Sequence, residues 1–225
     1  MNFKELNLTA VPSLKQRVYD YLLELILSDE LKPNTRLLEP EIAEALHISR
    51  APIREAINML ERDGFVTMRP NKGAFVAEMS YKNAVELWEF LAIMQPYTAR
   101  MSCGKIPALE LKKMRNELLI LQSEAHTYEE FAMSDKALHA MLGDYLENEM
   151  IKKQIKLLQA HATRFRWITD RNYENPEERM ISIEEHLQIV NALLEEDPDK
   201  VFTLTQKHME RGLRTLIAQK DREQK

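Results

Sequence analysis

The sequence predicts a mainly α-helical protein in two parts, a small N-terminal unit with a β-hairpin and a larger all-α bundle. Residues 1–79 combine helical periodicity with a hairpin signal, whereas strand signals vanish from residue 80 onward. With 225 residues, 44% of them hydrophobic, the chain is long enough for two domains with cores. We therefore expect one domain over residues 1–79 and a second over residues 80–225.

Two short helices are predicted at the start of the N-terminal unit. The first covers residues 13–29, where Ser13 can cap the first turn and apolar residues recur on one face. The segment LKPNTRL breaks this helix. The second covers residues 39–46 and places Pro40 in the first turn, where its missing N–H is not needed. The residues of this second helix expected to face inward are Ile42, Ala43 and Leu46.

A third helix and a hairpin follow at once. Ser49 is a good N-cap, Pro52 fits the first turn, and Gly64 is the expected left-handed end. FVTM and AFVA are short strand candidates, joined by the turn RPNKG. The apolar residues of the helix recur at helical spacing and are Ile53, Ala56, Ile57 and Leu60.

Helix, turn, helix and basic-tipped hairpin, in that order, predict a winged helix-turn-helix that binds duplex DNA. Such a fold places one helix in the major groove, which requires long donors at the N-terminal end of that helix. The residues expected to contact DNA are Ser49, Arg50, Arg54, Asn58, Lys72 and Gly73. The net charge of −5 is a weak objection, because the electrostatic footprint depends on local clustering.

The second part shows only helical periodicity. The expected helices cover residues 81–102, 107–125, 127–146, 148–169, 176–196 and 198–220. Six helices in one block predict an all-α bundle. The bundle is rich in methionine, which suits adaptable core packing and also a cavity for a small ligand.

A carboxylate and three imidazoles in the bundle could converge on a divalent transition metal. Asp135 and His139 are four residues apart and share a helix face, while His186 and His208 belong to two later helices. Metal sites are often assembled from facing helices of a bundle. An Asp–His pair at this spacing is also a common surface ion pair, and histidines beside apolar faces are usually core residues. Both interpretations stay open at this point.

Both halves resemble one family. LKPNTRLLEPEIAEALHISRAPIREAINMLERDGFVTMRPNKGAFV is similar to the signature of the GntR family of bacterial transcription factors, and the bundle resembles the FCD domain of its FadR subfamily. In that domain a D-x-x-x-H pair and two later histidines bind a divalent metal. The resemblance therefore implies metal ligation by Asp135, His139, His186 and His208. Zinc, nickel and manganese all suit such a set.

Within the expected DNA-binding unit, the chain departs from the family pattern in two respects. Members commonly carry glycine where Asn34 and His47 stand, and asparagine tolerates left-handed backbone better than histidine does. Many members also carry a basic, DNA-contacting residue at the position of Pro40. Arg36 is the candidate substitute for that contact.

A further departure concerns the ligand. The first helix of FCD domains often carries an arginine and a glutamate four apart, where this chain has Leu91 and Gln95. That arginine can hold a carboxylate effector. Arg164 or Arg166 is the expected charge partner in its place, because a guanidinium holds a carboxylate well.

The resemblance implies a cytoplasmic, ligand-responsive regulator, most simply a repressor, that binds an inverted-repeat operator as a homodimer. The absence of a secretory signal, the single cysteine and the lack of a membrane-spanning run agree with this expectation. Two alternatives remain. One is a metal-dependent hydrolase or oxygenase that uses the Asp/His cluster, although the sequence offers no convincing general acid or base. The other is an architectural DNA binder whose histidines are structural.

Overall fold

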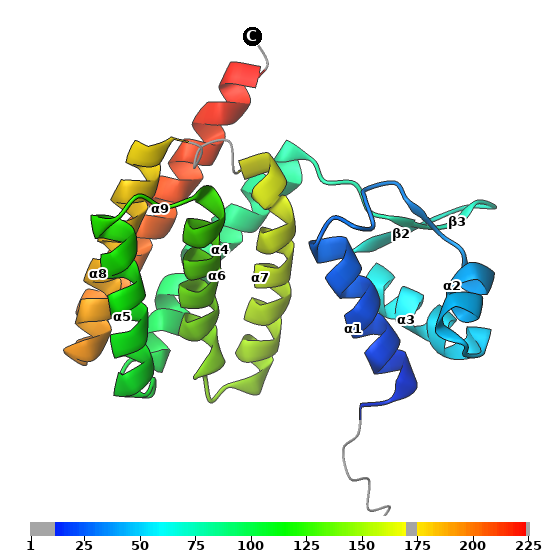
Figure 1. Ribbon diagram of the computed structural model, residues 1–225, viewed down its shortest axis with the longest axis horizontal. Coiled ribbons are helices and arrows are strands. Elements are labelled where there is room, and N and C mark those ends of the chain that lie inside the picture. Colours follow the sequence, from blue (N-terminus) through cyan, green and yellow to red (C-terminus); the bar gives the residue numbers. More distant parts are fainter. Residues whose placement is uncertain (1–11, 170–174, 224–225) are drawn as a thin grey trace, which may run out of the picture. The chain divides into compact units, whose positions relative to one another are not determined.

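The computed structural model describes residues 12–169 and 175–223 and divides the chain into two compact units (Figure 1). The first unit ends at Glu78 and the second begins at Met79. No helix among the described residues is both long and apolar enough to cross a membrane.

The N-terminal unit combines three helices with a small antiparallel sheet. Its elements are α1 (Leu14–Leu27), β1 (Arg36–Leu37), α2 (Glu39–Leu46), α3 (Arg50–Arg62), β2 (Val66–Arg69) and β3 (Gly73–Val76). The strand order is β1-β3-β2, with Arg36 opposite Phe75 and Val66 opposite Val76. The hairpin β2–β3 is the predicted wing. The two-residue strand β1 was not predicted.

The core of this unit lies between α1, α3 and the sheet. The apolar stripe predicted on α3 is buried in full, since Ile53, Ala56, Ile57 and Leu60 are at most 2% exposed. The residues that complete the core are Val18, Leu22, Ile26, Leu37, Phe65, Val66 and Val76. Because the inner face of α3 is fully used in packing, its polar face is left to solvent.

Left-handed backbone occurs at several turns, and three of these residues bear on the predictions. Gly64 has a φ of 83° at the end of α3, as predicted. Asn34 and His47 also have positive φ, 67° and 53°. At these two positions the family resemblance led us to expect glycine, and a residue with a side chain adopts this conformation at a greater cost.

Two local predictions were wrong in detail. Ser49 occupies the N-cap of α3, but its hydroxyl makes no capping hydrogen bond. It is exposed, so water can satisfy the free N–H groups of the first turn. On α2 no residue is fully buried, and Ile42, Ala43 and Leu46 are only partly covered. A helix of two turns at the edge of a small unit has too few neighbours to cover its inner face completely.

The second unit is a bundle of the six predicted helices. They are α4 (Tyr81–Ser102), α5 (Ala108–Ser123), α6 (Tyr128–Asp144), α7 (Glu149–Thr169), α8 (Pro176–Leu194) and α9 (Pro198–Glu223). Helix α4 packs against α6, α7 and α9, while α8 packs against α5 and α9. In Figure 1, α4 crosses behind α6 and α7. This packing brings together inner faces of α6, α8 and α9, the three helices that carry the candidate ligands.

Candidate metal centre and nucleic-acid interface

The structure brings the four predicted ligands together inside the bundle. His186 Nε2 lies 3.2 Å from His208 Nε2, which lies 3.4 Å from His139 Nε2. Asp135 Oδ1 lies 3.4 Å from His139 Nε2 and 3.7 Å from His186 Nε2. His186 and His208 are buried, and His139 is partly buried. Ligand atoms of the three histidines therefore form one group within 4.8 Å of one another, and Asp135 lies beside two of them, His139 and His186.

These separations fit the edges of a metal coordination shell. Metal–nitrogen bonds of about 2.0–2.1 Å in a tetrahedral site place neighbouring ligand atoms about 3.3 Å apart. The observed spacings of 3.2 to 3.7 Å lie near that value. The residues present therefore fit a divalent metal, and a mixed carboxylate–imidazole set suits a transition ion.

Two of the histidines, His186 and His208, are biased toward the neutral form that metal binding requires. Burial lowers the pKa of His186 well below its ordinary value, and the neighbouring His208 lowers it further. Burial also lowers the pKa of His208, although its hydrogen bond to Glu185 acts in the opposite direction. Neutral rings that turn Nε2 lone pairs toward one another repel, and a cation between them removes that repulsion.

The Glu185 carboxylate orients the His208 ring through the nitrogen that does not face the candidate metal centre, Nδ1. Glu185 Oε2 lies 2.7 Å from His208 Nδ1, so Nδ1 carries the proton and Nε2 presents its lone pair to the centre. Arg211 Nε donates to Glu185 Oε1 at 2.8 Å, and Arg211 also donates to Glu178 and Ser182. Burial would raise the pKa of Glu185, but the hydrogen bonds from His208 and Arg211 outweigh it and lower that pKa. Glu185 is therefore an anion at neutral pH.

His139 has a different support. The Gln95 side-chain amide lies 2.7 Å from His139 Nδ1, and Gln95 is buried on α4. The atom of Gln95 that faces Nδ1 is the amide nitrogen Nε2, which also lies 3.4 Å from the His139 backbone carbonyl. Metal binding through His139 Nε2 requires the proton on Nδ1, so the Gln95 amide must then turn to present its oxygen. Gln159 on α7 donates to the His139 backbone carbonyl at 2.6 Å. Helices α4 and α7 thus hold His139 in place.

His186 is held by packing. It is fully buried, and its ring lies parallel to Phe131 at a centroid distance of 6.5 Å. Its Nδ1 has no hydrogen-bond partner among the described residues. Packing therefore orients the His186 ring together with the contacts that its Nε2 makes with His208 and Asp135.

On the N-terminal unit, the predicted contact residues of α3 are exposed together. Arg50, Arg54 and Asn58 lie on the face opposite the buried stripe. Arg54 is paired with Glu39 at the start of α2, and its Nε and Nη2 donate to the carboxylate at 2.8 to 3.1 Å. The hydrogen bonds from Arg54 lower the pKa of Glu39 despite partial burial. Glu39 was not foreseen as part of this surface.

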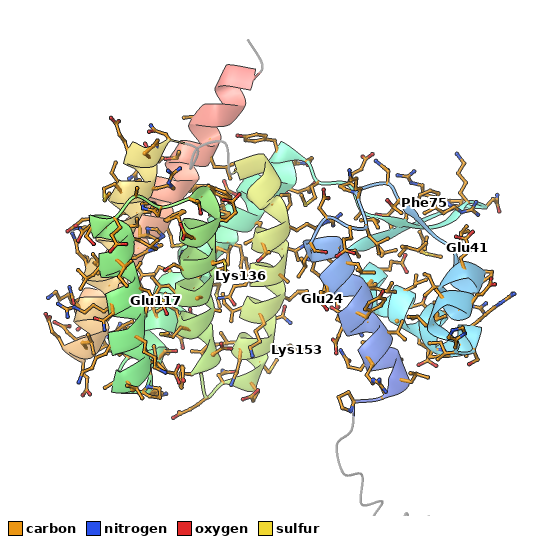
Figure 2. All side chains as sticks on the ribbon, in the orientation of Figure 1. Glu24, Glu41, Phe75, Glu117, Lys136 and Lys153 are labelled. Atoms are coloured by element: carbon orange, nitrogen blue, oxygen red, sulfur yellow. The ribbon has the colours of Figure 1, made fainter. Side chains whose placement is uncertain are left out.

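The wing gathers further basic side chains. Lys72 is exposed in the turn between β2 and β3, next to Gly73 with its φ of 90°. The guanidinium of Arg36 lies over Gly73, where a Cβ would meet its Nη2 at 3.8 Å. Arg69 stacks over the ring of Phe75, 4.3 Å from the ring centre. Phe75 is labelled in Figure 2. Arg36, Lys72 and Gly73 therefore lie in one region of the wing, as a phosphate-binding surface requires.

The predicted effector arginines are only partly described. Arg164 lies on α7 and is buried, with 4% exposed. The side chain of Arg166 lies outside the described residues. A buried guanidinium is normally paired or hydrogen-bonded, and Arg164 does take part in an interaction within the chain.

Comparison with known families identifies both units. Residues 14–76 match the model described as "Bacterial regulatory proteins, gntR family", and residues 86–211 match the FCD domain. The chain belongs to the GntR family of regulators, with an FCD domain. As a GntR regulator it carries the helix-turn-helix within the first match, and the four converging side chains lie within the second.

Characterised relatives and solved structures agree with this assignment. The Nta operon transcriptional regulator of Aminobacter aminovorans is 27% identical over 83% of this chain and 87% of its own length. The HTH-type transcriptional repressor RspR of Escherichia coli K12 is 24% identical over 92% of this chain and 90% of its own length. McbR/YncC of E. coli has the same fold, with a TM-score of 0.71 at 18% identity over 93% of this chain and 99% of that one. The structure of a GntR regulator from Rhodococcus sp. RHA1 has a TM-score of 0.69 at 20% identity, over 92% of this chain and 98% of that one.

The supporting residues of both sites were missed at the level of sequence. Glu185 immediately precedes one candidate ligand and Arg211 follows another by three residues. That adjacency was the available signal, because an outer partner of a metal-bound histidine is usually a carboxylate. Nothing in the local pattern connected Glu39 with Arg54, fifteen residues later, since this pairing depends on how α2 and α3 pack.

Proposed function

We propose that this GntR regulator is a metal-containing repressor that binds an inverted-repeat DNA operator as a homodimer in the cytoplasm and releases it in response to a small metabolite. The convergence of Asp135, His139, His186 and His208 carries the metal part of the proposal. The exposed arginines of α3 support the DNA part. RspR, a relative over most of the chain, is described as a repressor, which supports that direction of control.

The metal is proposed to bind the effector. The spacings of the four protein ligands suit a four-coordinate ion, so an external oxyanion binds only if the ion expands to five or six ligands. A carboxylate suits such a position, with Arg164 as charge partner for a second acidic group. Manganese, nickel and zinc are all compatible with the donor set. The protein itself holds the three imidazoles in position while the ligand binds, and burial keeps His186 and His208 neutral.

A catalytic role is less well supported. A metal-dependent hydrolase needs a general acid or base within hydrogen-bond reach of the reacting group. Glu185, whose carboxylate lies 2.7 Å from His208, is already hydrogen-bonded to His208 and Arg211. These hydrogen bonds suit Glu185 to the positioning of His208 and leave its carboxylate poorly placed to exchange a proton with a bound ligand.

Selection from a random-sequence DNA library tests the DNA part. We expect enrichment of an inverted repeat, because the two-fold symmetry of a dimer is mirrored in its operator. If the selected DNA stayed random in sequence after repeated rounds, and binding fell steeply with salt, the protein would bind DNA only non-specifically and the operator proposal would be wrong.

Thermal-shift screening of small carboxylates with metal-loaded protein tests the effector part. A true effector should stabilise the wild type, lose its effect in His139→Ala, and change operator affinity by about 5- to 150-fold. Equal stabilisation of metal-free protein would separate the effector from the metal centre.

A further inference from the structure

The face of the small sheet that points away from the core carries two arginines. Arg36 of β1 is paired with Phe75 of β3. Arg69 of β2 is paired with Gly73, two residues before Phe75 on β3. Residues opposite each other in an antiparallel pair share a face, and side chains alternate along each strand. Ala74, on the other face of β3, is buried, so both arginines lie on the solvent side of the sheet.

Arg69 is held on this face from two sides. Its guanidinium carbon lies 4.3 Å from the centre of the Phe75 ring, in the range of a cation–π contact. Its Nη2 donates to Oδ1 of Asn34, and Nδ2 of Asn34 donates to Oε1 of Glu78. Asn34 therefore bridges an arginine of the wing and a carboxylate that follows the wing in sequence.

The chemistry of the two neighbours determines the orientation of the Asn34 amide. A guanidinium only donates and an ionised carboxylate only accepts, whereas an amide has one donating end and one accepting end. A single orientation of the amide therefore satisfies both Arg69 and Glu78. The backbone is also fixed, because the N–H of Asn34 donates to the carbonyl of Val76 at 2.9 Å. Glu78 thus selects the orientation in which the amide oxygen faces Arg69.

We propose that Asn34 is a positioning residue for DNA binding, which holds the guanidinium of Arg69 where it contacts the phosphate backbone beside the wing. The inference rests on the proposed function in one respect, namely that this unit binds duplex DNA. An amide, unlike a carboxylate, holds a guanidinium without neutralising the charge that attracts a phosphate. This role also gives a use to a side chain at a left-handed position, φ 67°, where the family resemblance led us to expect glycine.

A double-mutant cycle tests whether Asn34 acts through Arg69. Arg69→Met removes the charge but keeps an unbranched side chain on Phe75, and Asn34→Gly removes the amide while easing the left-handed backbone. On a short duplex of random sequence, Arg69→Met should weaken binding about tenfold and lower the salt-dependence slope by about one. Asn34→Gly should cause a smaller loss of the same kind, and no further loss in the Arg69→Met background. Additive losses would overturn the proposal.

Asn71→Gly is the matched control for the change in backbone freedom. Asn71 lies in the wing turn, is exposed like Asn34, and has a similar φ of 59°. Glycine accepts this conformation readily, so urea unfolding should show both glycine variants folded. Only Asn34→Gly should lose affinity for the duplex. A loss of equal size in Asn71→Gly would assign the effect to the backbone and contradict the proposal.

Two neutral replacements of Glu78 separate its hydrogen bond from its charge. Both remove a negative charge near the wing, which by itself strengthens the attraction to DNA. Glutamine keeps an acceptor oxygen for Asn34, whereas alanine has none. Glu78→Gln should therefore bind the duplex at least as tightly as the wild type, and Glu78→Ala should bind more weakly than Glu78→Gln. Equal affinities of the two variants would overturn the proposal.

The same titrations keep the two possible failures apart. Wild-type protein that bound no duplex at all would contradict the proposed function, and this inference with it. Wild-type protein that bound the duplex, with additive losses in the double-mutant cycle, would remove the role of Asn34 and leave the DNA-binding function intact.

Discussion

At the residue scale, the pairing of Arg54 with Glu39 determines which donors α3 presents. A guanidinium has five N–H groups, and Glu39 accepts from those on Nε and Nη2. The outer edge, formed by Nη1 and the remaining Nη2 hydrogen, stays available. That edge has the fork geometry that recognises a guanine in the major groove. Glu39 thus orients Arg54 without consuming its recognition edge.

Arg54→Ala should weaken binding to the selected operator by about 1–3 kcal/mol and leave binding to random DNA much less affected, because a bidentate base contact is lost. Arg62→Ala on the same helix is a matched control: both arginine side chains are 65% exposed and both pair with a carboxylate. Fluorescence anisotropy measures both affinities. Equal losses for the two variants would mean that Arg54 acts only through its charge.

Glu185→Gln should lower metal affinity about 10- to 100-fold, because the amide no longer supplies the negative charge that fixes the His208 tautomer. Glu184→Gln is the control, since Glu184 is the exposed neighbour that bonds Gln122. Competition with a chromophoric chelator gives both affinities. If the two variants bound metal equally well, Glu185 would have no part in orienting His208.

The ligands themselves could be proposed from sequence, but the residues that orient them could not. Asp135 and His139 share a helix face, which periodicity predicts. The Glu185–Arg211 pair depends on the register between α8 and α9, and Gln95 reaches His139 across 44 residues of sequence. Such contacts follow from tertiary packing, for which local spacing carries no signal.

At the element scale, helices were predicted more accurately than strands. The bounds of α2 and α4 agree with the prediction, whereas each strand of the wing is displaced by one residue. Long periodic segments and proline-marked starts are strong signals, but β1 has two residues and exists only because β3 pairs with it. A strand that short has no pattern of its own.

The Tyr19 hydroxyl of helix α1 donates a hydrogen bond to Asp63, at the end of α3, over 2.9 Å. Burial and this bond both raise the pKa of Tyr19. Tyr19→Phe should lower the free energy of unfolding by about 0.5–1.5 kcal/mol, because Asp63 loses a partly buried donor. Urea unfolding measures the loss. Tyr21→Phe, at an exposed position of the same helix, should change stability little, and a comparable loss there would contradict the assignment.

At the scale of the whole molecule, the metal centre joins α6, α8 and α9, and its supporting residues extend to α4 and α7. Metal removal should therefore loosen the bundle. Chelation should lower its melting temperature, since an ion at a hundred times its dissociation constant contributes about 2.7 kcal/mol to the folded state. Differential scanning calorimetry with and without chelator makes the comparison. Unchanged melting of the bundle would show that the histidines stabilise it without an ion.

The central claim is that Asp135, His139, His186 and His208 bind one metal ion in a DNA-binding regulator. Elemental analysis of protein purified without chelator tests it most directly, with His208→Ala and the peripheral His126→Ala measured alongside. We predict about one divalent ion per chain in the wild type and in His126→Ala, and far less in His208→Ala, which removes one ligand of the set. A metal-free wild type, or full occupancy in His208→Ala, would contradict the claim.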